Sequence, residues 1–315
     1  MKAAVVRGPH QTPAYGDFAD PVARDGFTVL EVVASALSNA TRARAAGSHY
    51  SSTGGFPLVP GIDGVGRDDS GQRFAFLLPE APHGGMAERT LVRDALCLPV
   101  PDGVGDVLAA AIINPAQSPL GALRARADLQ PGEAVLINGA TGITGQVAVQ
   151  IARHLGAGRV VATGRNRAAL DRLTELGADH TVDLSAEPDA VRAELETHTE
   201  GVGVVLDYLS GPPTEAVLAA LARHQAGTPV RYVIAGTSAS AATSVPTSVL
   251  AATPLTLMGS GIGAVRVPEI LQSVRDALQI AATVPLQIDI EERPLREVAE
   301  AWTVNQDRRR VVFTL

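Results

Sequence analysis

Apolar and polar positions divide the chain into three parts with different periodicities. The first hundred residues contain short apolar stretches broken by glycine and proline, which is typical of β-rich structure. From Glu133 onwards, apolar runs alternate with segments of helical spacing, and near the C-terminus the pattern returns to strands. This order predicts two domains, the first of which is completed by the C-terminal segment. We expect the β-rich domain over residues 1–114 and 283–315, and the second domain over residues 115–282.

Strands are expected at the start of the chain and again at its end. Glycines between the early apolar runs, including Gly64 and Gly66, are interpreted as turn positions. A helix over Ala109–Ala127 is expected to be interrupted at Pro115 and Pro119. The expected strands are Lys2–Val6, Phe27–Val33, Gln72–Leu78, Glu88–Val92, Pro285–Ile290 and Arg310–Leu315, and a further helix is expected at Leu295–Val304.

The middle of the chain consists of repeated strand–helix units. Such alternation predicts a doubly wound parallel sheet with right-handed crossovers. Ligands of these sheets bind beyond the carboxyl ends of the strands. The expected strands are Ala134–Ile137, Arg159–Thr163, His180–Asp183, Val202–Asp207, Val230–Ile234 and Leu255–Met258, and the expected helices are Arg167–Leu176, Ala190–Thr197 and Thr214–Arg223.

A glycine-rich turn joins the first of these strands to a helix in the stretch AVLINGATGITGQVAVQIARHLGA, Ala134–Ala157. Gly139, Gly142 and Gly145 lie three residues apart, and their missing Cβ atoms let backbone approach a phosphate. The helix N-terminus adds free N–H groups and a partial positive charge. Because Ala140 breaks the usual glycine spacing, a plain strand–turn–helix remains an alternative. The context nevertheless favours a nucleotide pyrophosphate site.

Residues after the second strand bear on the choice of cofactor. NAD-binding sites usually place Asp or Glu there, on the ribose 2′-hydroxyl. The stretch Thr163–Arg167 has no acid and contains Arg165 and Arg167, and a guanidinium can bind a 2′-phosphate bidentately. We therefore expect NADPH rather than NADH, the alternative being that both arginines only begin a solvated helix.

Composition narrows the range of functions. The 315 residues are 46% hydrophobic and carry a net charge of −7, which argues against nucleic-acid binding. A single cysteine, Cys97, excludes an intrachain disulfide and a cysteine-cluster zinc lobe. The start MKAAVVRG does not look like a signal peptide, and no apolar run reaches membrane-spanning length. We expect a cytoplasmic protein without a membrane partner.

Several motifs occur together in a characteristic order: PLVPGIDGVG (Pro57–Gly66), GGMAE (Gly84–Glu88), the glycine-rich turn, LGADHTVDL (Leu176–Leu184), GVVLDYLSG (Gly203–Gly211) and PLTLMGS (Pro254–Ser260). With them the chain resembles the medium-chain dehydrogenase/reductase superfamily, in its zinc-free quinone oxidoreductase (zeta-crystallin-like) branch. The resemblance covers nearly the whole chain. It implies an α/β protein with a GroES-like β-barrel domain and a Rossmann domain.

Zinc is not expected. The triplet Gly61–Ile62–Asp63 matches the Gly-His-Glu of zinc-containing relatives, so isoleucine replaces a zinc ligand, and Asn39 lies near the place of the early zinc cysteine. Catalytic zinc needs about three converging ligands. Asp63 lacks such partners, and we interpret it as a turn aspartate that bonds nearby backbone.

The resemblance assigns the chemistry to hydrogen-bond donors. Asn39 and Tyr50 keep the family spacing of eleven residues, and both can donate to a carbonyl oxygen that gains charge during hydride addition. Arg42 stands where many relatives carry Asp. The alternative role of Tyr50 is structural, as an aromatic side chain that packs on Phe56. The resemblance places cofactor contacts at Ser118, Gly139, Thr141, Gly142, Ile143, Thr144, Gly145, Gly164, Arg165, Arg167, Gly236, Thr237 and Ser260.

The expected activity is NADPH-dependent hydride transfer to a quinone or an α,β-unsaturated carbonyl compound, by a homodimer that pairs through Pro254–Ser260. A non-enzymatic NADPH-responsive binding or structural protein and a zinc-free alcohol/carbonyl oxidoreductase remain alternatives. A short-chain-type reductase is disfavoured, because none of the four tyrosines is followed by lysine four positions later.

Overall fold

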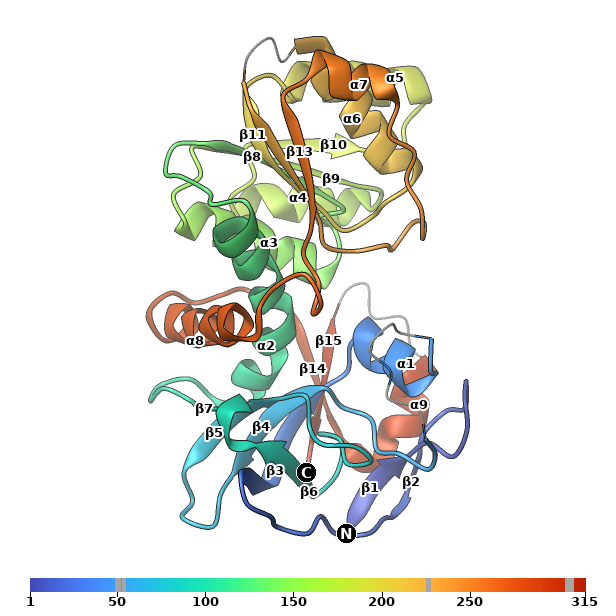
Figure 1. The fold of residues 1–315 in the computed structure, drawn as a ribbon, viewed down its shortest axis with the longest axis vertical. Helices are drawn as coiled ribbons and strands as arrows, with labels where there is room; N and C mark the ends of the chain where they lie inside the picture. The colour runs from blue at the N-terminus through green and yellow to red at the C-terminus, as the bar shows by residue number, and fades with distance from the viewer. Residues whose placement is uncertain (49–51, 53–54, 225–227, 304–308) are drawn as a thin grey trace. The chain divides into compact units, whose positions relative to one another are not determined.

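The computed structural model describes residues 1–48, 52, 55–224, 228–303 and 309–315 (Figure 1). The chain forms two compact units, Met1–Asn114 with Val274–Leu315, and Pro115–Ser273. The first boundary falls inside helix α2 (Asp106–Leu120), and the second falls inside α8 (Val267–Thr283). The sequence analysis expects the second boundary at residue 283, nine residues after the Val274 of the structure. It predicts no helix over Val267–Thr283, the helix inside which the boundary falls.

The first unit is built on a seven-stranded mixed sheet. Its order is β14 (Ile290–Pro294), β15 (Arg310–Thr314), β3 (Phe27–Ala36), β4 (Asp63–Arg67), β5 (Arg73–Leu77) and β7 (Cys97–Pro99), and β6 (Arg89–Arg93) also pairs with β3. A separate antiparallel pair joins β1 (Lys2–Val5) and β2 (Ala14–Asp17). The last strand, β15, pairs with β3, so the C-terminus completes the first unit.

Gly64 and Gly66 lie in strand β4, and the expectation that they mark turns was wrong. A Cβ on Gly64 would lie 2.6 Å from the Ala34 carbonyl oxygen, and one on Gly66 would lie 2.8 Å from that of Glu31. Both glycines therefore allow β4 to approach β3 closely at a register shift between Val32 and Ala34.

The second unit contains a six-stranded parallel sheet. The strand order is β10 (His180–Asp183), β9 (Arg159–Gly164), β8 (Ala134–Asn138), β11 (Val202–Asp207), β12 (Val230–Ile234) and β13 (Leu255–Gly259). This is the order of a dinucleotide-binding fold, with its switch point between β8 and β11. Strands β8 and β11 are almost wholly buried, as expected where helices cover both faces.

Helices connect these strands. They are α3 (Ile143–His154), α4 (Arg167–Glu175), α5 (Pro188–His198), α6 (Pro212–His224) and α7 (Thr247–Ala252). Figure 1 shows α5, α6 and α7 grouped beside one another, and the first two also pack together. One hydrophobic core beneath them includes Leu136, Val205, Leu218 and Tyr232.

Three predicted elements differ from the structure. Helix α2 continues through Pro115 and Pro119 and passes into a π-helical segment, η2 (Gly121–Arg126). The predicted interruption was wrong because burial of Ile112, Ile113 and Leu120 stabilises the helix against the cost of proline.

The strand predicted at Pro285–Ile290 was also wrong, since residues 285–289 have no regular structure and β14 begins at Ile290. Strand β14 forms over the residues that pair in parallel with β15, from Ile290 opposite Arg310 to Pro294 opposite Thr314. The helix predicted to follow it is divided into η3 (Leu295–Glu297) and α9 (Val298–Thr303). None of the described helices is both long and apolar enough to cross a membrane.

Candidate cofactor-binding site

The glycine-rich turn follows β8 in the second unit. Gly139 has a φ of +86°, a left-handed conformation that strongly favours glycine. A Cβ on Gly145 would lie 2.5 Å from the Ala140 Cα, so only glycine lets α3 begin against this turn. The Ala140 N–H donates to the Thr163 carbonyl at 2.7 Å, which ties the turn to β9. The unusual alanine is therefore part of the turn and does not interrupt it.

Helix α3 begins with unsatisfied donors. Its N-cap is Gly142, which provides no side-chain cap, and no acidic residue lies in the first turn. The N–H groups of Ile143, Thr144 and Gly145 have no carbonyl one turn earlier in the helix to accept from them. Nothing lies within 4 Å of where a Gly142 Cβ would be, so the space above the turn is open. These features fit the pyrophosphate of a dinucleotide.

The end of β9 forms the second wall of this site. A Cβ on Gly164 would collide with the Thr141 side chain. Thr141 can therefore lie against the end of β9 only because position 164 is glycine. Gln146 Nε2 donates to the Thr141 carbonyl at 3.0 Å and fixes the turn from the helix side. The positions expected at Gly164 and Thr141 are therefore brought together.

Arg165 and Arg167 differ in their surroundings. Asn166 caps α4 by accepting from the Ala169 N–H at 3.2 Å, and Arg167 forms an exposed ion pair with Asp171 at 3.4 Å. Arg165 is exposed, and its side chain has no hydrogen bond or ion pair with any residue that the structure describes. Arg165 is thus the guanidinium that is available to a 2′-phosphate.

A buried polar network lies beneath the switch point, and sequence reasoning assigned it no role. Asp207, at the end of β11, accepts hydrogen bonds from Asn138 Nδ2 at 3.0 Å, from Thr214 Oγ1 at 2.6 Å and from the Tyr232 hydroxyl. Its other oxygen accepts from the Leu209 N–H at 2.7 Å. An aspartate that ends an apolar strand run was the available signal in the sequence.

The network extends directly to the glycine-rich turn. Thr163 Oγ1 donates to Asn138 Oδ1 at 2.6 Å and accepts from the Gly139 N–H at 3.1 Å. Burial, and then the adjacent Asp207 carboxylate, raises the pKa of Tyr232 well above its usual value, so this hydroxyl remains a donor. The carboxylate therefore fixes the ends of several strands around the site.

The remaining expected contacts lie at the carboxyl ends of β11, β12 and β13. Gly236 N–H donates to the Asp207 carbonyl at 3.2 Å, and Ser260 N–H donates to the Ile234 carbonyl at 2.8 Å. Thr237 is exposed. Ser118 of α2 lies beside Tyr208, whose buried hydroxyl has no well-formed hydrogen bond among the described residues. Burial raises the pKa of Tyr208, and Ser118 partly opposes this effect.

Of the two expected catalytic donors, the structure describes Asn39, which belongs to the first unit. Asn39 is exposed and begins helix α1 (Asn39–Ala45), where the Ser38 Oγ caps the helix by accepting from the Thr41 N–H at 2.9 Å. Tyr50 lies outside the described residues. Arg42 Nη2 donates to the Ala301 carbonyl at 3.4 Å, so this side chain is directed toward α9.

Asp63 is not a turn residue, and that interpretation was wrong. It begins β4, is only 2% exposed, and its Oδ1 has no hydrogen-bond partner among the described residues. Burial raises its pKa to about 6, against the opposing charge of the buried Arg310. Arg310 is held by a 2.8 Å bond from Nη1 to the Leu37 carbonyl. Among the described residues no group of three or more His, Cys, Asp or Glu side chains is placed to hold a metal ion.

The chain is similar to several known oxidoreductases. Residues 144–280 match the family model described as zinc-binding dehydrogenase. The chain is 27% identical to a probable NADPH-dependent quinone reductase of Emericella nidulans, over 92% of each protein. It is 33% identical to an acrylyl-CoA reductase of Ruegeria pomeroyi, over 45% of this chain and 47% of that protein.

A solved quinone oxidoreductase from Thermus thermophilus, which was also studied in complex with NADPH, superimposes with a TM-score of 0.79. It is 27% identical, and the match covers 100% of both chains. The family model, the relative that spans nearly the whole chain and the shared fold all point to one family. These comparisons support placing the chain in the medium-chain dehydrogenase/reductase superfamily, in its quinone oxidoreductase branch.

Proposed function

We propose that the protein is an NADPH-dependent reductase of quinones or α,β-unsaturated carbonyl compounds. The observation that carries this proposal is the glycine turn from Gly139 to Gly145, followed by the exposed Arg165 at the end of the next strand. The relatives named as an NADPH-dependent quinone reductase and an acrylyl-CoA reductase support the same class of reaction.

The chain's own residues would hold NADPH at the carboxyl edge of the parallel sheet. The open N-terminus of α3 would receive the pyrophosphate, and Arg165 would bind the 2′-phosphate. Ser118, Gly236, Thr237 and Ser260 lie toward the second half of the sheet and would contact the nicotinamide half. When bound, the cofactor supplies the hydride.

Polarisation of the substrate is assigned to Asn39 and Tyr50. An amide and a phenol can both donate to the substrate oxygen, and these bonds strengthen as charge develops there. A phenol is ordinarily protonated at neutral pH and can donate a proton to the enolate, which is the second role proposed for Tyr50. The proposed reaction requires no zinc ion.

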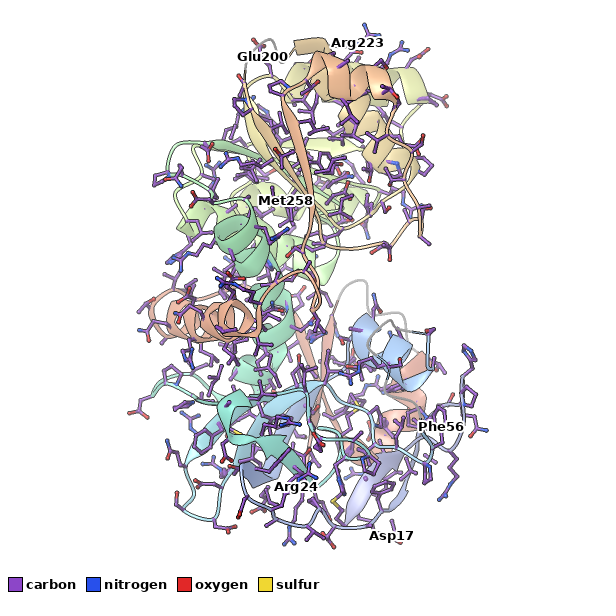
Figure 2. All side chains as sticks on the ribbon, in the orientation of Figure 1. Asp17, Arg24, Phe56, Glu200, Arg223 and Met258 are labelled. Atoms are coloured by element: carbon purple, nitrogen blue, oxygen red, sulfur yellow. The ribbon has the colours of Figure 1, made fainter. Side chains whose placement is uncertain are left out.

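We further propose that the protein is a homodimer formed through β13. This strand ends the sheet and pairs only with β12 among the described strands. Its residues Thr256 and Leu257 are exposed, and Met258 on the same strand is labelled in Figure 2. An unpaired, partly apolar edge strand favours pairing with a second copy across a two-fold axis.

Loss of NADPH absorbance with a panel of quinones and enones tests the proposed activity. We expect turnover with conjugated carbonyl acceptors and NADPH, much less with NADH, and no loss after treatment with a chelator. Cofactor binding without turnover on any acceptor would favour a non-enzymatic NADPH-responsive protein. Oxidation of simple alcohols instead of enone reduction would favour an alcohol/carbonyl oxidoreductase.

A further inference from the structure

The first unit contains a cavity of its own. Its volume is about 380 Å³, and all of its described lining residues lie between Thr41 and Gly84. Most of the wall is apolar: Phe56, Leu58, Val59 and Ile62 contribute to it, with several prolines. Phe56 is labelled in Figure 2. A pocket of this size accommodates a small organic molecule.

Among the described residues that line this apolar cavity, Arg44 is the cation. Arg44 lies in the last turn of α1 and is half-buried, and burial lowers the pKa of its guanidinium. The side chain forms no ion pair with the described residues, and none of the described lining residues is Asp or Glu. Arginine remains protonated in proteins, so the positive charge persists there without a protein counter-charge.

His83, which also lines the cavity, does not add a second charge. Its Nε2 lies 3.3 Å from the Ala19 carbonyl oxygen, and its ring packs edge-on against Phe18. Burial lowers its pKa below the ordinary 6.5, so the ring is neutral at neutral pH. Among the described lining residues, Arg44 therefore carries the charge of the cavity.

We infer that this cavity binds the substrate and that Arg44 selects conjugated carbonyl compounds that carry an acidic group. A partly desolvated guanidinium gains most from a carboxylate or phosphate, which it binds through short, charge-assisted hydrogen bonds. The helix that carries Arg44 begins at Asn39, the proposed donor to the substrate carbonyl. The inference rests on the proposed function and adds a substrate class to it.

Matched substrate pairs test the charge preference. Acetylacrylate and its methyl ester contain the same conjugated ketone and differ by one carboxylate. The acrylyl thioesters of 4′-phosphopantetheine and of pantetheine differ by one phosphate. For the wild-type protein we expect a higher kcat/KM on the anionic member of at least one pair. The cavity volume favours the compact carboxylate, whereas a preference confined to the phosphopantetheine thioester would identify phosphate as the anion.

The variant Arg44→Gln removes the cation and keeps a long polar side chain. We expect kcat/KM on the preferred anionic substrate to fall about 10- to 100-fold, mainly through KM, the loss typical of hydrogen bonds to a charged group. kcat/KM on the neutral partner should fall by a much smaller factor, so that the preference for the anionic substrate is lost. Arg7→Gln, at an exposed arginine of the same unit, is the control for net charge.

A binding measurement separates recognition from chemistry. Levulinate, the reduction product of acetylacrylate, should inhibit the wild-type protein competitively and more strongly than methyl levulinate does, and Arg44→Gln should remove the difference. Equal kcat/KM for the charged and uncharged members of both pairs in the wild type, or an unchanged preference in Arg44→Gln, would overturn the inference while neutral enones are still reduced. Failure to reduce any member of either pair with NADPH would overturn the proposed function itself.

Discussion

Asn39 and Tyr50 are the two side chains on which the proposed chemistry depends most directly. We expect Asn39→Ala and Tyr50→Phe each to lower kcat about 100-fold or more, because each removes a donor to the oxygen that gains negative charge. Affinity for NADPH should remain within twofold, since neither residue belongs to the unit that carries the glycine turn. Wild-type turnover in both variants would contradict the assigned roles.

Arg165 determines the expected cofactor preference. Because its guanidinium is exposed and has no described partner, Arg165→Glu should weaken NADPH binding by about 1.5–3 kcal/mol, the size of a hydrogen bond to a charged group. NADH affinity should change far less. Titration of both cofactors by calorimetry measures the two constants, and Arg275→Glu at an exposed position of α8 serves as the control. Equal affinity of the wild type for both cofactors would disprove the assignment.

Asp63 makes stability depend on pH in an unusual direction. Its pKa rises from 3.8 to about 6 on folding, so the folded protein binds this proton more tightly than the unfolded chain. The proton on Asp63 stabilises the folded state fully below about pH 4, and this stabilisation is lost as the pH rises through about 6. The free energy of unfolding thereby changes by about 3 kcal/mol.

Urea unfolding of the wild type and of Asp63→Asn isolates this effect. The free energy of unfolding of the wild type minus that of the variant should fall by about 3 kcal/mol between pH 4 and pH 7. A difference that is constant with pH, or that rises with it, would show that the carboxyl group titrates normally.

Individual residues were predictable where a local motif specifies them. The turn that contains Gly139 and Gly145 could be located from their spacing and context, because one strand–turn–helix unit contains both residues. The buried contacts of Asp207 with Thr214 and Tyr232 could not, since they join three strand–helix units. Likewise, the burial of Asp63 beside Arg310 depends on pairing between distant strands.

The glycine-rich turn gives a test that separates folding from binding. Gly145→Ala places a Cβ 2.5 Å from the Ala140 Cα and should lower the free energy of unfolding by about 1–3 kcal/mol. Gly142→Ala meets nothing within 4 Å and has a φ of −77°, so its free energy of unfolding should remain nearly unchanged.

Affinity for NADPH should nevertheless fall in Gly142→Ala, because its methyl group enters the space proposed for the pyrophosphate. Thermal unfolding and NADPH titration of both variants provide the comparison. A Gly142→Ala protein with normal affinity would place the phosphates elsewhere.

Elements with a strong local period were predictable, whereas those stabilised by packing were not. The six parallel strands and helix α4 follow their sequence patterns closely. The persistence of α2 through two prolines depends on burial, and the position of β14 depends on its partner β15. Neither cause can be read from the residues of the element itself.

Association of two chains should depend on β13. Because Leu257 is exposed on this edge strand, Leu257→Lys should shift a wild-type dimer toward monomer without changing the sheet. Sedimentation velocity at micromolar concentration measures the change, and Val22→Lys, at an exposed apolar position of the first unit, is the control. A monomeric wild-type protein would contradict the proposed dimer.

Transfer of deuterium from cofactor to product tests the central claim, that the protein moves a hydride from NADPH to an electron-poor conjugated carbonyl compound. The protein is incubated with an enone and NADPH deuterated at either face of C4, and the product is analysed by mass spectrometry. We predict that deuterium from only one face of C4 is transferred, and that it is found at the β-carbon of the product. The account would be contradicted by a reduced product that contains deuterium from neither of the two deuterated forms of NADPH. Oxidation of NADPH without any reduced product would also contradict it.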